Sequence, residues 1–281
     1  MREGILPLHE PFSRTFETGI LETQGYPLVK QKLPTDFADR LIAHRGYAGR
    51  YPENTIPAIE AALAAGARNI ELDLQLTADR VPVIFHDRDL FRIMGVTGRV
   101  GELTVSEFLT QEATYRARFG GKFTGTRPAT LEQVITTLAA HPEVTFFLEI
   151  KRVTLEQVGV EKTVEIVLNA VARIINPLVL LSFSRTAVQV VREQSSYPIG
   201  WVLERFDDEH RNRADTLQPD FLICNKDKIH KALWPGVWQW VVYEVETPGT
   251  ALEWLSRGVH YVESMWPGDL LAQVSSGEGP Q

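Results

Sequence analysis

From residue 41 onward, short apolar runs alternate with longer stretches in which apolar residues recur at helical spacing. The short runs indicate buried strands, and the longer stretches indicate helices with one apolar face. Regular alternation of the two is typical of βα units built around a parallel sheet. Strands are expected at 41–44, 69–76, 81–86, 144–151, 178–183, 199–203, 220–224, 239–243 and 259–263.

The connection between the second and third of these nine strands consists of residues 77–80 alone. A parallel crossover needs about a dozen residues or more, so these two strands are expected to form an antiparallel hairpin. Eight parallel strands remain, which predicts an α/β fold of the (β/α)8 TIM-barrel type with its active site at the carboxyl ends of the strands. The helical pattern is clearest at 56–65, 130–140, 155–175, 185–194 and 250–257.

Two segments do not follow the βα pattern. Residues 1–40 contain several prolines and no sustained period, which predicts an N-terminal extension packed on a barrel domain spanning 41–275. Residues 88–127 are rich in glycine and predict a loop with one short helix near 106–108. Loops of this length are usually functional, so a short lid over the barrel is expected.

Charge and cysteine content narrow the possible partners. The net charge of −7 argues against nucleic acid or an anionic membrane as the main partner, because both favour a surplus of Lys and Arg. No stretch approaches the ~20 apolar residues that cross a bilayer, and the start shows no signal-peptide pattern. Cys224 is the only cysteine, which excludes an internal disulfide. A soluble, cytoplasmic protein without stable membrane insertion is expected, and its oligomeric state is left open.

Acidic residues alternate with apolar ones on two of the predicted strands. Side chains alternate across a strand, so Glu71 and Asp73 share one face, as do Glu149 and Lys151. If the apolar faces meet the helices, three carboxylates and one ammonium converge inside the barrel mouth. Close carboxylates repel one another unless a cation neutralises them, and Mg²⁺ or Ca²⁺ suits such oxygen ligands. The alternative is that each acid pairs with a base such as Lys151 or Arg45.

Two histidines stand at predicted strand ends, His44 after the first strand and His86 after the hairpin. An isolated histidine at such a place is more often a hydrogen-bonded turn residue than a catalyst. Together, two imidazoles with an ordinary pKa of about 6.5 have the chemistry of a base and an acid at neutral pH. Phe183 and Trp240 are candidates for an apolar rim or wall of the ligand site, with packing in the core as the alternative for Trp240.

These residues form a series of short motifs that resembles the glycerophosphodiester phosphodiesterase family over roughly residues 41 to 270. The motifs are His44-Arg45-Gly46, Pro52-Glu53-Asn54-Thr55, Glu71-Leu72-Asp73, Thr77 with Asp79, Pro82-Val83 with His86-Asp87, Thr130-Leu131-Glu132, Glu149-Ile150-Lys151 and Ser182-Phe183. The chain departs from the family at Trp240-Val241-Val242-Tyr243, where Trp-Thr-Val-Asn is usual. That departure bears on substrate choice.

The resemblance implies a (β/α)8 enzyme that uses one divalent metal ion to hydrolyse a small glycerophosphodiester to sn-glycerol 3-phosphate and an alcohol. It also implies a role for each matching residue. The acid and base pair is His44 and His86, the metal ligands are Glu71, Asp73 and Glu149, and the phosphate-binding group is Arg45, Lys151 and Glu53.

Two other functions fit the sequence. The first is a lysophospholipase D-type activity on lysophospholipids, which needs an apolar groove at the rim; Phe91, Ile93, Met94 and Phe108 are the candidates for it. The second is a non-catalytic barrel that binds phosphate esters. Such a protein is expected to lack a histidine or a carboxylate of the set, and this chain retains all of them.

Overall fold

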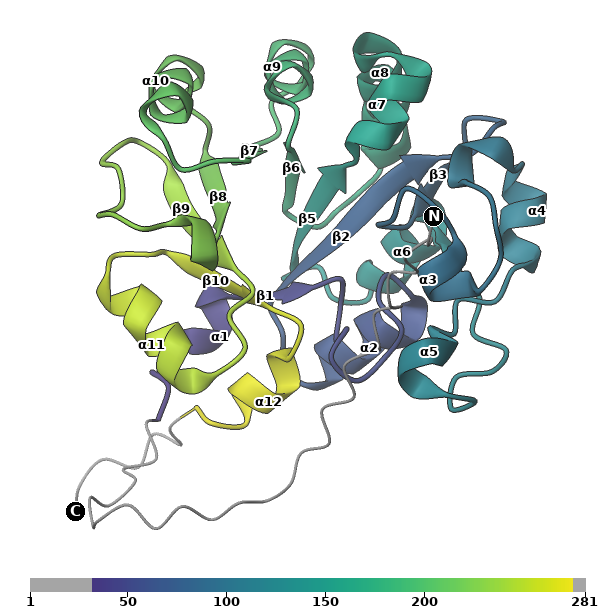
Figure 1. The fold of residues 1–281 in the computed structure, drawn as a ribbon, viewed down its shortest axis with the longest axis horizontal. Helices are drawn as coiled ribbons and strands as arrows, with labels where there is room; N and C mark the ends of the chain where they lie inside the picture. Colours follow the sequence, from purple (N-terminus) through teal and green to yellow (C-terminus); the bar gives the residue numbers. More distant parts are fainter. Residues whose placement is uncertain (1–31, 275–281) are drawn as a thin grey trace, which may run out of the picture. The chain divides into compact units, whose positions relative to one another are not determined.

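The computed structural model of the protein describes residues 32–274, so residues 1–31 of the predicted extension lie outside the described part. Within it, eight parallel strands form a closed ring (Figure 1). The ring closes where β1 pairs with both β10 and β2, with Ile42 opposite Glu263 on one side and Asn69 on the other. The predicted TIM barrel is confirmed. Its strands are β1 (Leu41–His44), β2 (Asn69–Leu76), β5 (Thr145–Ile150), β6 (Leu178–Ser182), β7 (Ile199–Val202), β8 (Phe221–Asn225), β9 (Gln239–Tyr243) and β10 (Tyr261–Ser264).

Two short strands lie outside the ring. β3 (Pro82–Ile84) runs antiparallel to β2, with Ile84 opposite Leu74. β4 (Ala129–Thr130) runs antiparallel to β3. β4 was not predicted, because two residues are too few for a period of two to be recognised.

Helices follow the strands of the ring and cover its outside (Figure 1). The predicted helix over 155–175 is instead two helices, because the chain turns at Gly159, whose φ of +89° favours glycine. α10 was not predicted, since its strongly charged sequence buries only His210, Ala214 and Leu217. The helices outside 88–127 are α1 (Phe37–Arg40), α2 (Ile56–Ala64), α6 (Leu131–Leu138), α7 (Arg152–Val158), α8 (Val160–Val171), α9 (Arg185–Gln194), α10 (Asp208–Leu217), α11 (Pro248–Ser256), α12 (Pro267–Leu271) and the 3-10 helix η2 (Lys226–Lys228).

Residues 88–127 contain four short helices where the sequence predicted one. They are α3 (Phe91–Met94), η1 (Val100–Glu102), α4 (Val105–Thr110) and α5 (Arg116–Phe119). α4 contains the helix predicted near 106–108, and the other three are too short to show a helical period in sequence. They share a small hydrophobic cluster of their own with residues of the β3 region, in which Ile93, Met94 and Phe108 are buried.

The strands divide their side chains between two apolar layers. On β2, Ile70, Leu72 and Leu74 belong to the cluster between the strands and the helices. A second cluster of Ile42, Phe147 and other strand residues fills the barrel interior. Because side chains alternate along a strand, the acidic residues between the apolar ones of β2 face inward.

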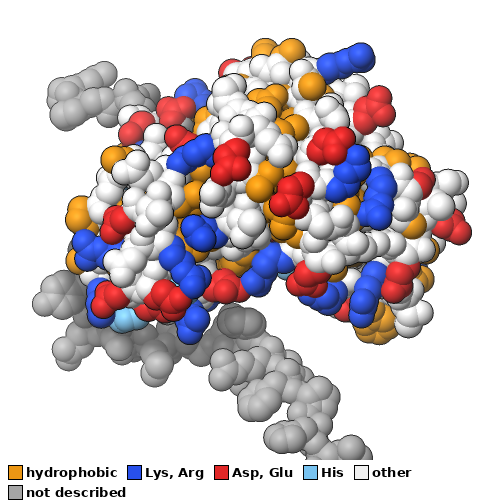
Figure 2. Space-filling view, turned by 90° about the horizontal axis from the view of Figure 1, so that it is seen from above, with side chains coloured by type: hydrophobic (Ala, Val, Ile, Leu, Met, Phe, Trp, Pro, Cys, Tyr) orange, Lys and Arg blue, Asp and Glu red, His pale blue; other side chains and the backbone are white. Residues whose placement is uncertain are grey.

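The surface seen in Figure 2 carries interleaved acidic and basic side chains with hydrophobic ones between them. Among residues 32–274, no helix has the length and apolar composition needed to cross a membrane.

Candidate active site

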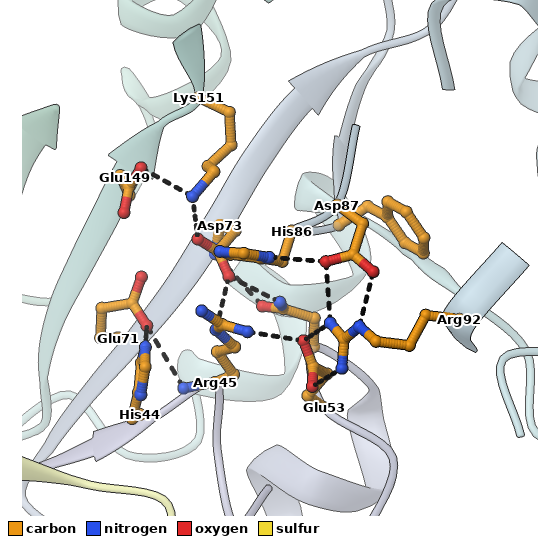
Figure 3. A network of polar contacts seen from close by, with 12 residues as sticks. His44, Arg45, Glu53, Glu71, Asp73, His86, Asp87, Arg92, Glu149 and Lys151 are labelled. Carbon is orange, nitrogen blue, oxygen red and sulfur yellow. Dashed lines mark hydrogen bonds and ion pairs between the residues drawn. The ribbon is translucent and has the colours of Figure 1, made fainter. Parts of the chain in front are cut away.

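A cavity of about 270 Å³ opens among the carboxyl ends of the barrel strands. Six of the residues singled out in the sequence for the reaction line it: His44, Arg45, Glu71, His86, Glu149 and Lys151. Figure 3 shows these side chains pointing toward one another from β1, β2, β5 and the end of β3. Residues from four separate strands therefore meet at one place.

Three carboxylates lie together at the base of this cluster. Oxygen atoms of Glu71, Asp73 and Glu149 all lie within 4.8 Å of one another. The ammonium of Lys151 is 3.0 Å from Asp73 and 2.8 Å from Glu149, so ion pairing accounts for these two acids. Glu71 is different, because its Oε1 is buried without a hydrogen-bond partner. An unpaired carboxylate oxygen beside two further carboxylates is a donor set that fits Mg²⁺ or Ca²⁺.

The pKa values of these three acids are shifted in different directions by burial and by neighbouring charges. Burial raises the pKa of Glu71 well above its usual range, and the charges of Asp73 and Glu263 add to the effect. Burial likewise raises the pKa of Glu149, against the opposing charge of Lys151. Burial also disfavours the charged form of Asp73, but Lys151, together with other positive charges, outweighs it and holds the pKa well below its usual range. The balance of burial and neighbouring charges thus favours the charged form of Asp73 and the neutral form of Glu71, and a bound cation would favour the charged form of Glu71.

His44 is held neutral at the end of β1. Burial, and then the charge of Arg45, lower the pKa of its imidazole well below 6.5. Its Nε2 lies 3.8 Å from Glu71 and 3.4 Å from Glu263. Glu263 was missed in the sequence analysis, although an acid at the carboxyl end of a predicted barrel strand was the available signal. Its side chain is buried, and this burial raises its pKa to about 8.

His86 follows β3 and faces the cavity from the other side. Its Nδ1 lies 2.8 Å from Oδ1 of Asp87, which leaves Nε2 free for other contacts. Burial disfavours the charged form of Asp87, but hydrogen bonds from His86 and Arg92 outweigh it and hold the pKa of Asp87 well below its usual range. Arg92, which also contacts Glu53, was not singled out in the sequence.

Arg45 belongs to the turn that joins β1 to α2. Its Nη1 donates to Glu53 at 2.7 Å and its Nε lies 3.1 Å from Asp73. Burial opposes the charge of Arg45, but Asp73 and Glu53 outweigh it and raise its pKa further. The turn is tight at Gly46, whose φ is +76° and where a Cβ would lie 2.7 Å from the backbone of Ala58.

The surrounding polar groups fix these positions. The side-chain amide of Asn54 donates to Asp73 at 2.8 Å, and its carbonyl accepts from the backbone N–H of Asp73 at 3.1 Å. This pair of bonds ties the turn after β1 to the centre of β2.

Comparison with known proteins identifies the same family as the sequence motifs. The family model described as the glycerophosphoryl diester phosphodiesterase family matches residues 44–237. The chain belongs to this family. The match begins at His44 and includes the whole predicted metal, phosphate and histidine set.

The matches between this family member and its relatives cover different shares of the relatives' length. YhdW of Bacillus subtilis is 38% identical over 153 residues, 54% of this chain, and the match spans 60% of YhdW. Human glycerophosphodiester phosphodiesterase 1 is 26% identical over 234 residues, which are 79% of this chain and 70% of the human protein. An Oleispira antarctica phosphodiesterase, solved with the product sn-glycerol 3-phosphate, superposes with a TM-score of 0.73 at 22% identity, covering 83% of this chain and 96% of that one. At that identity the likeness establishes the fold.

The two aromatic residues considered for the cavity wall of this glycerophosphodiester phosphodiesterase family member lie in different parts of the barrel. Phe183 lines the cavity. Trp240 does not, because its indole lies in the outer core and donates to the carbonyl of Trp234 at 3.0 Å. On β9 the inward positions belong to Val241 and Tyr243, as strand alternation requires.

The groove considered for a lysophospholipid is not formed by the four residues expected to line it. Ile93, Met94 and Phe108 are buried in the hydrophobic cluster of the 88–127 region. Phe91 alone of the four is exposed, at 66%.

Proposed function

We propose that this chain hydrolyses glycerophosphodiesters to sn-glycerol 3-phosphate and an alcohol with the help of one divalent cation, and that residues 41–275 carry the activity. The observation that carries the proposal is that His44, His86, Arg45, Lys151, Glu71 and Glu149 line one cavity of a family member, with Asp73 beside the two glutamates. The sn-glycerol 3-phosphate complex of the Oleispira phosphodiesterase supports the choice of product.

Glu71, Asp73 and Glu149 would hold the cation, Mg²⁺ or Ca²⁺. The unpaired Oε1 of Glu71 supports this assignment. When bound, such an ion supplies positive charge that stabilises the phosphoryl oxygens of the transition state. Lys151, which ion pairs with two of the three carboxylates, would then be shared between them and the substrate phosphate.

Arg45 and Lys151 would bind the phosphate of the substrate. Both line the cavity, and neighbouring carboxylates keep both charged: burial opposes the charge of each, but Asp73 together with Glu53 or Glu149 raises the pKa. A phosphodiester is an anion that resists nucleophilic attack, so fixed positive charge lowers the barrier. Glu53 would hold Arg45 in place through the 2.7 Å hydrogen bond at Nη1.

The histidines would move the protons. His44, held neutral by burial, is suited to accept a proton from the nucleophile, which is a water molecule or the neighbouring glycerol hydroxyl of the substrate. In the second case the alcohol leaves, a cyclic phosphate forms, and water must then open this ring to give sn-glycerol 3-phosphate. His86 would donate a proton to the departing alkoxide oxygen, with Asp87 fixing its ring through Nδ1. The 88–127 region, joined to Glu53 through Arg92, would act as the lid or rim of the cavity.

The decisive experiment measures release of sn-glycerol 3-phosphate from glycerophosphocholine and related diesters. We expect EDTA to abolish release and added Mg²⁺, Ca²⁺ or Mn²⁺ to restore it; full activity after thorough metal removal would refute the metal assignment. Lysophosphatidylcholine serves as the comparison substrate. The burial of Ile93, Met94 and Phe108 favours the deacylated substrate over the lysolipid.

A further inference from the structure

Arg92 lies outside every motif that identified the site, yet it joins two of the site's acids. It is the second residue of α3, and its guanidinium contacts Asp87 and Glu53 together. Nε donates to Asp87 at 2.6 Å and Nη2 donates to the same carboxylate at 2.8 Å. On the other side, Nη1 and Nη2 donate to Glu53 at 2.8 and 2.7 Å. One side chain thus makes two bidentate contacts (Figure 3).

Each of these two carboxylates continues to a group that lines the cavity. Asp87 contacts Nδ1 of His86 at 2.8 Å. Glu53 accepts from Nη1 of Arg45 at 2.7 Å. Arg92 is therefore connected to His86 through the carboxylate of Asp87. It is connected to the phosphate-binding Arg45 through the carboxylate of Glu53.

The electrostatics explain why a cation is needed at this point. Glu53 is 4% exposed, and its carboxylate would otherwise have Arg45 as its one basic ion-pair partner in the described part of the chain. Burial disfavours the charged form of Glu53, but the hydrogen bonds from Arg92, with the charge of Arg45, lower its pKa. Without Arg92, Glu53 would lose two of its hydrogen bonds and the position of its carboxylate against Arg45 would no longer be fixed from the other side, and Asp87 would lose its bidentate contact.

The chemistry of the contact specifies arginine. Only a planar guanidinium presents parallel N–H donors on two edges, so it can hold two carboxylates at fixed angles. A lysine would keep the positive charge but could not make the two bidentate contacts. The guanidinium is also held by Tyr115, whose ring centroid lies 5.1 Å from its Cζ. Tyr115 and Arg92 both belong to the 88–127 region, so this region is connected to the cavity through Arg92.

We propose that Arg92 is a positioning residue, which holds His86 through Asp87 and Arg45 through Glu53 in the geometry that the reaction requires. This inference rests on the proposed hydrolysis and adds a residue outside the cavity lining. It makes correct placement of α3 a condition for turnover.

The test compares Arg92→Gln and Arg92→Lys with Arg88→Gln. Arg88 is a matched control, because it lies in the same region and makes an exposed ion pair with Glu156 at 2.7 Å. We expect kcat to fall roughly 10- to 100-fold in both Arg92 variants, as is common when a supporting partner of a site residue is lost, and to stay unchanged in Arg88→Gln. Ethylguanidinium added to Arg92→Ala should restore part of kcat, which loss of folding alone would not allow. Removal of Arg92 from an Asp87→Asn, Glu53→Gln background should cause little further loss.

A readout independent of turnover separates this inference from the proposed function. Imidazole ¹⁵N NMR of His86 should change in Arg92→Gln and stay as in the wild type in Arg88→Gln. If the wild type hydrolyses no diester, the proposed function fails, and the NMR comparison still decides the positioning role. Unchanged His86 signals, or a kcat of Arg92→Gln within twofold of the wild type, would overturn the inference.

Discussion

Nε2 of His44 lies 3.4 Å from Oε1 of Glu263, across the pairing of β1 with β10. This contact places an acid whose pKa burial raises to about 8 against the histidine of the opening motif. Both side chains are largely shielded from water, and among the described residues Glu263 has His44 as its one ion-pair partner. A carboxyl group in this setting holds its proton more tightly in the folded protein than in the unfolded chain.

We therefore predict that the metal-free protein loses stability as pH rises through the range between the two pKa values of Glu263. A folded-state pKa of about 8, against 4.5 for the free group, means that stability is fully present below about 4.5 and is lost as pH approaches 8. A tenfold change in proton affinity corresponds to ~1.4 kcal/mol, so the upper bound on this loss is a few kcal/mol. Urea unfolding at pH 5.5 and pH 8 measures it.

The variant Glu263→Gln removes this titration and should reduce the pH dependence, leaving the part that comes from the raised pKa values of Glu71 and Glu149. Asp87→Asn is the control, because a carboxyl with a lowered pKa changes stability only at acid pH, below this window. Equal slopes for the wild type and Glu263→Gln would contradict the prediction.

A second prediction concerns metal binding in the absence of substrate. Mg²⁺ or Ca²⁺ should raise the melting temperature of the wild type, since a ligand that binds only the folded state stabilises it by ~2.7 kcal/mol at one hundred times its Kd. Glu71→Gln should abolish the shift, because it removes the acid whose Oε1 lacks a partner. Glu244→Gln, at another acid of the cavity lining, should retain it. The assignment is wrong if Glu71→Gln binds the ion as the wild type does, measured by calorimetry.

Strand alternation explains why this part of the site was predictable. A period of two fixes which side chains share a face, so Glu71, Asp73 and Glu149 were placed together from sequence alone. The rule predicts the position of a side chain only when the sequence also shows which face of the strand points inward. Around Trp240 apolar residues occupy both faces, so the sequence did not show it. Trp240 was therefore left open and proved to lie in the outer core.

The rest of the site depends on contacts between distant segments. Arg92 meets Glu53 across 39 positions of sequence, in a region without a usable period. Glu263 reaches His44 only because the last strand closes the ring against the first. α10 escaped detection for a local reason, since its apolar face is too sparse to show a helical period.

A third prediction tests the proton-transfer pair. Replacing His44 or His86 by Ala should lower kcat about 10²- to 10⁴-fold, the range expected when a general acid or base is removed, while circular dichroism stays unchanged. His141→Ala is the control, because this partly exposed histidine lies outside the cavity lining. Near-normal turnover of either variant would remove that histidine from the mechanism.

The last prediction concerns the turn that carries Arg45. Gly46 has a φ of +76°, and an added Cβ would lie 2.7 Å from the backbone of Ala58 in α2. Gly66 has a φ of +90° with nothing within 4 Å of its Cβ position, so Gly66→Ala measures backbone strain alone, about 1–2 kcal/mol. Gly46→Ala adds a backbone clash that must move either α2 or the turn. We expect it to lose more stability in urea unfolding than Gly66→Ala and, unlike Gly66→Ala, to lower kcat at least tenfold, because His44 and Arg45 immediately precede it. Equal losses of stability and activity in the two variants would show that the close approach of Gly46 to α2 does not position the site.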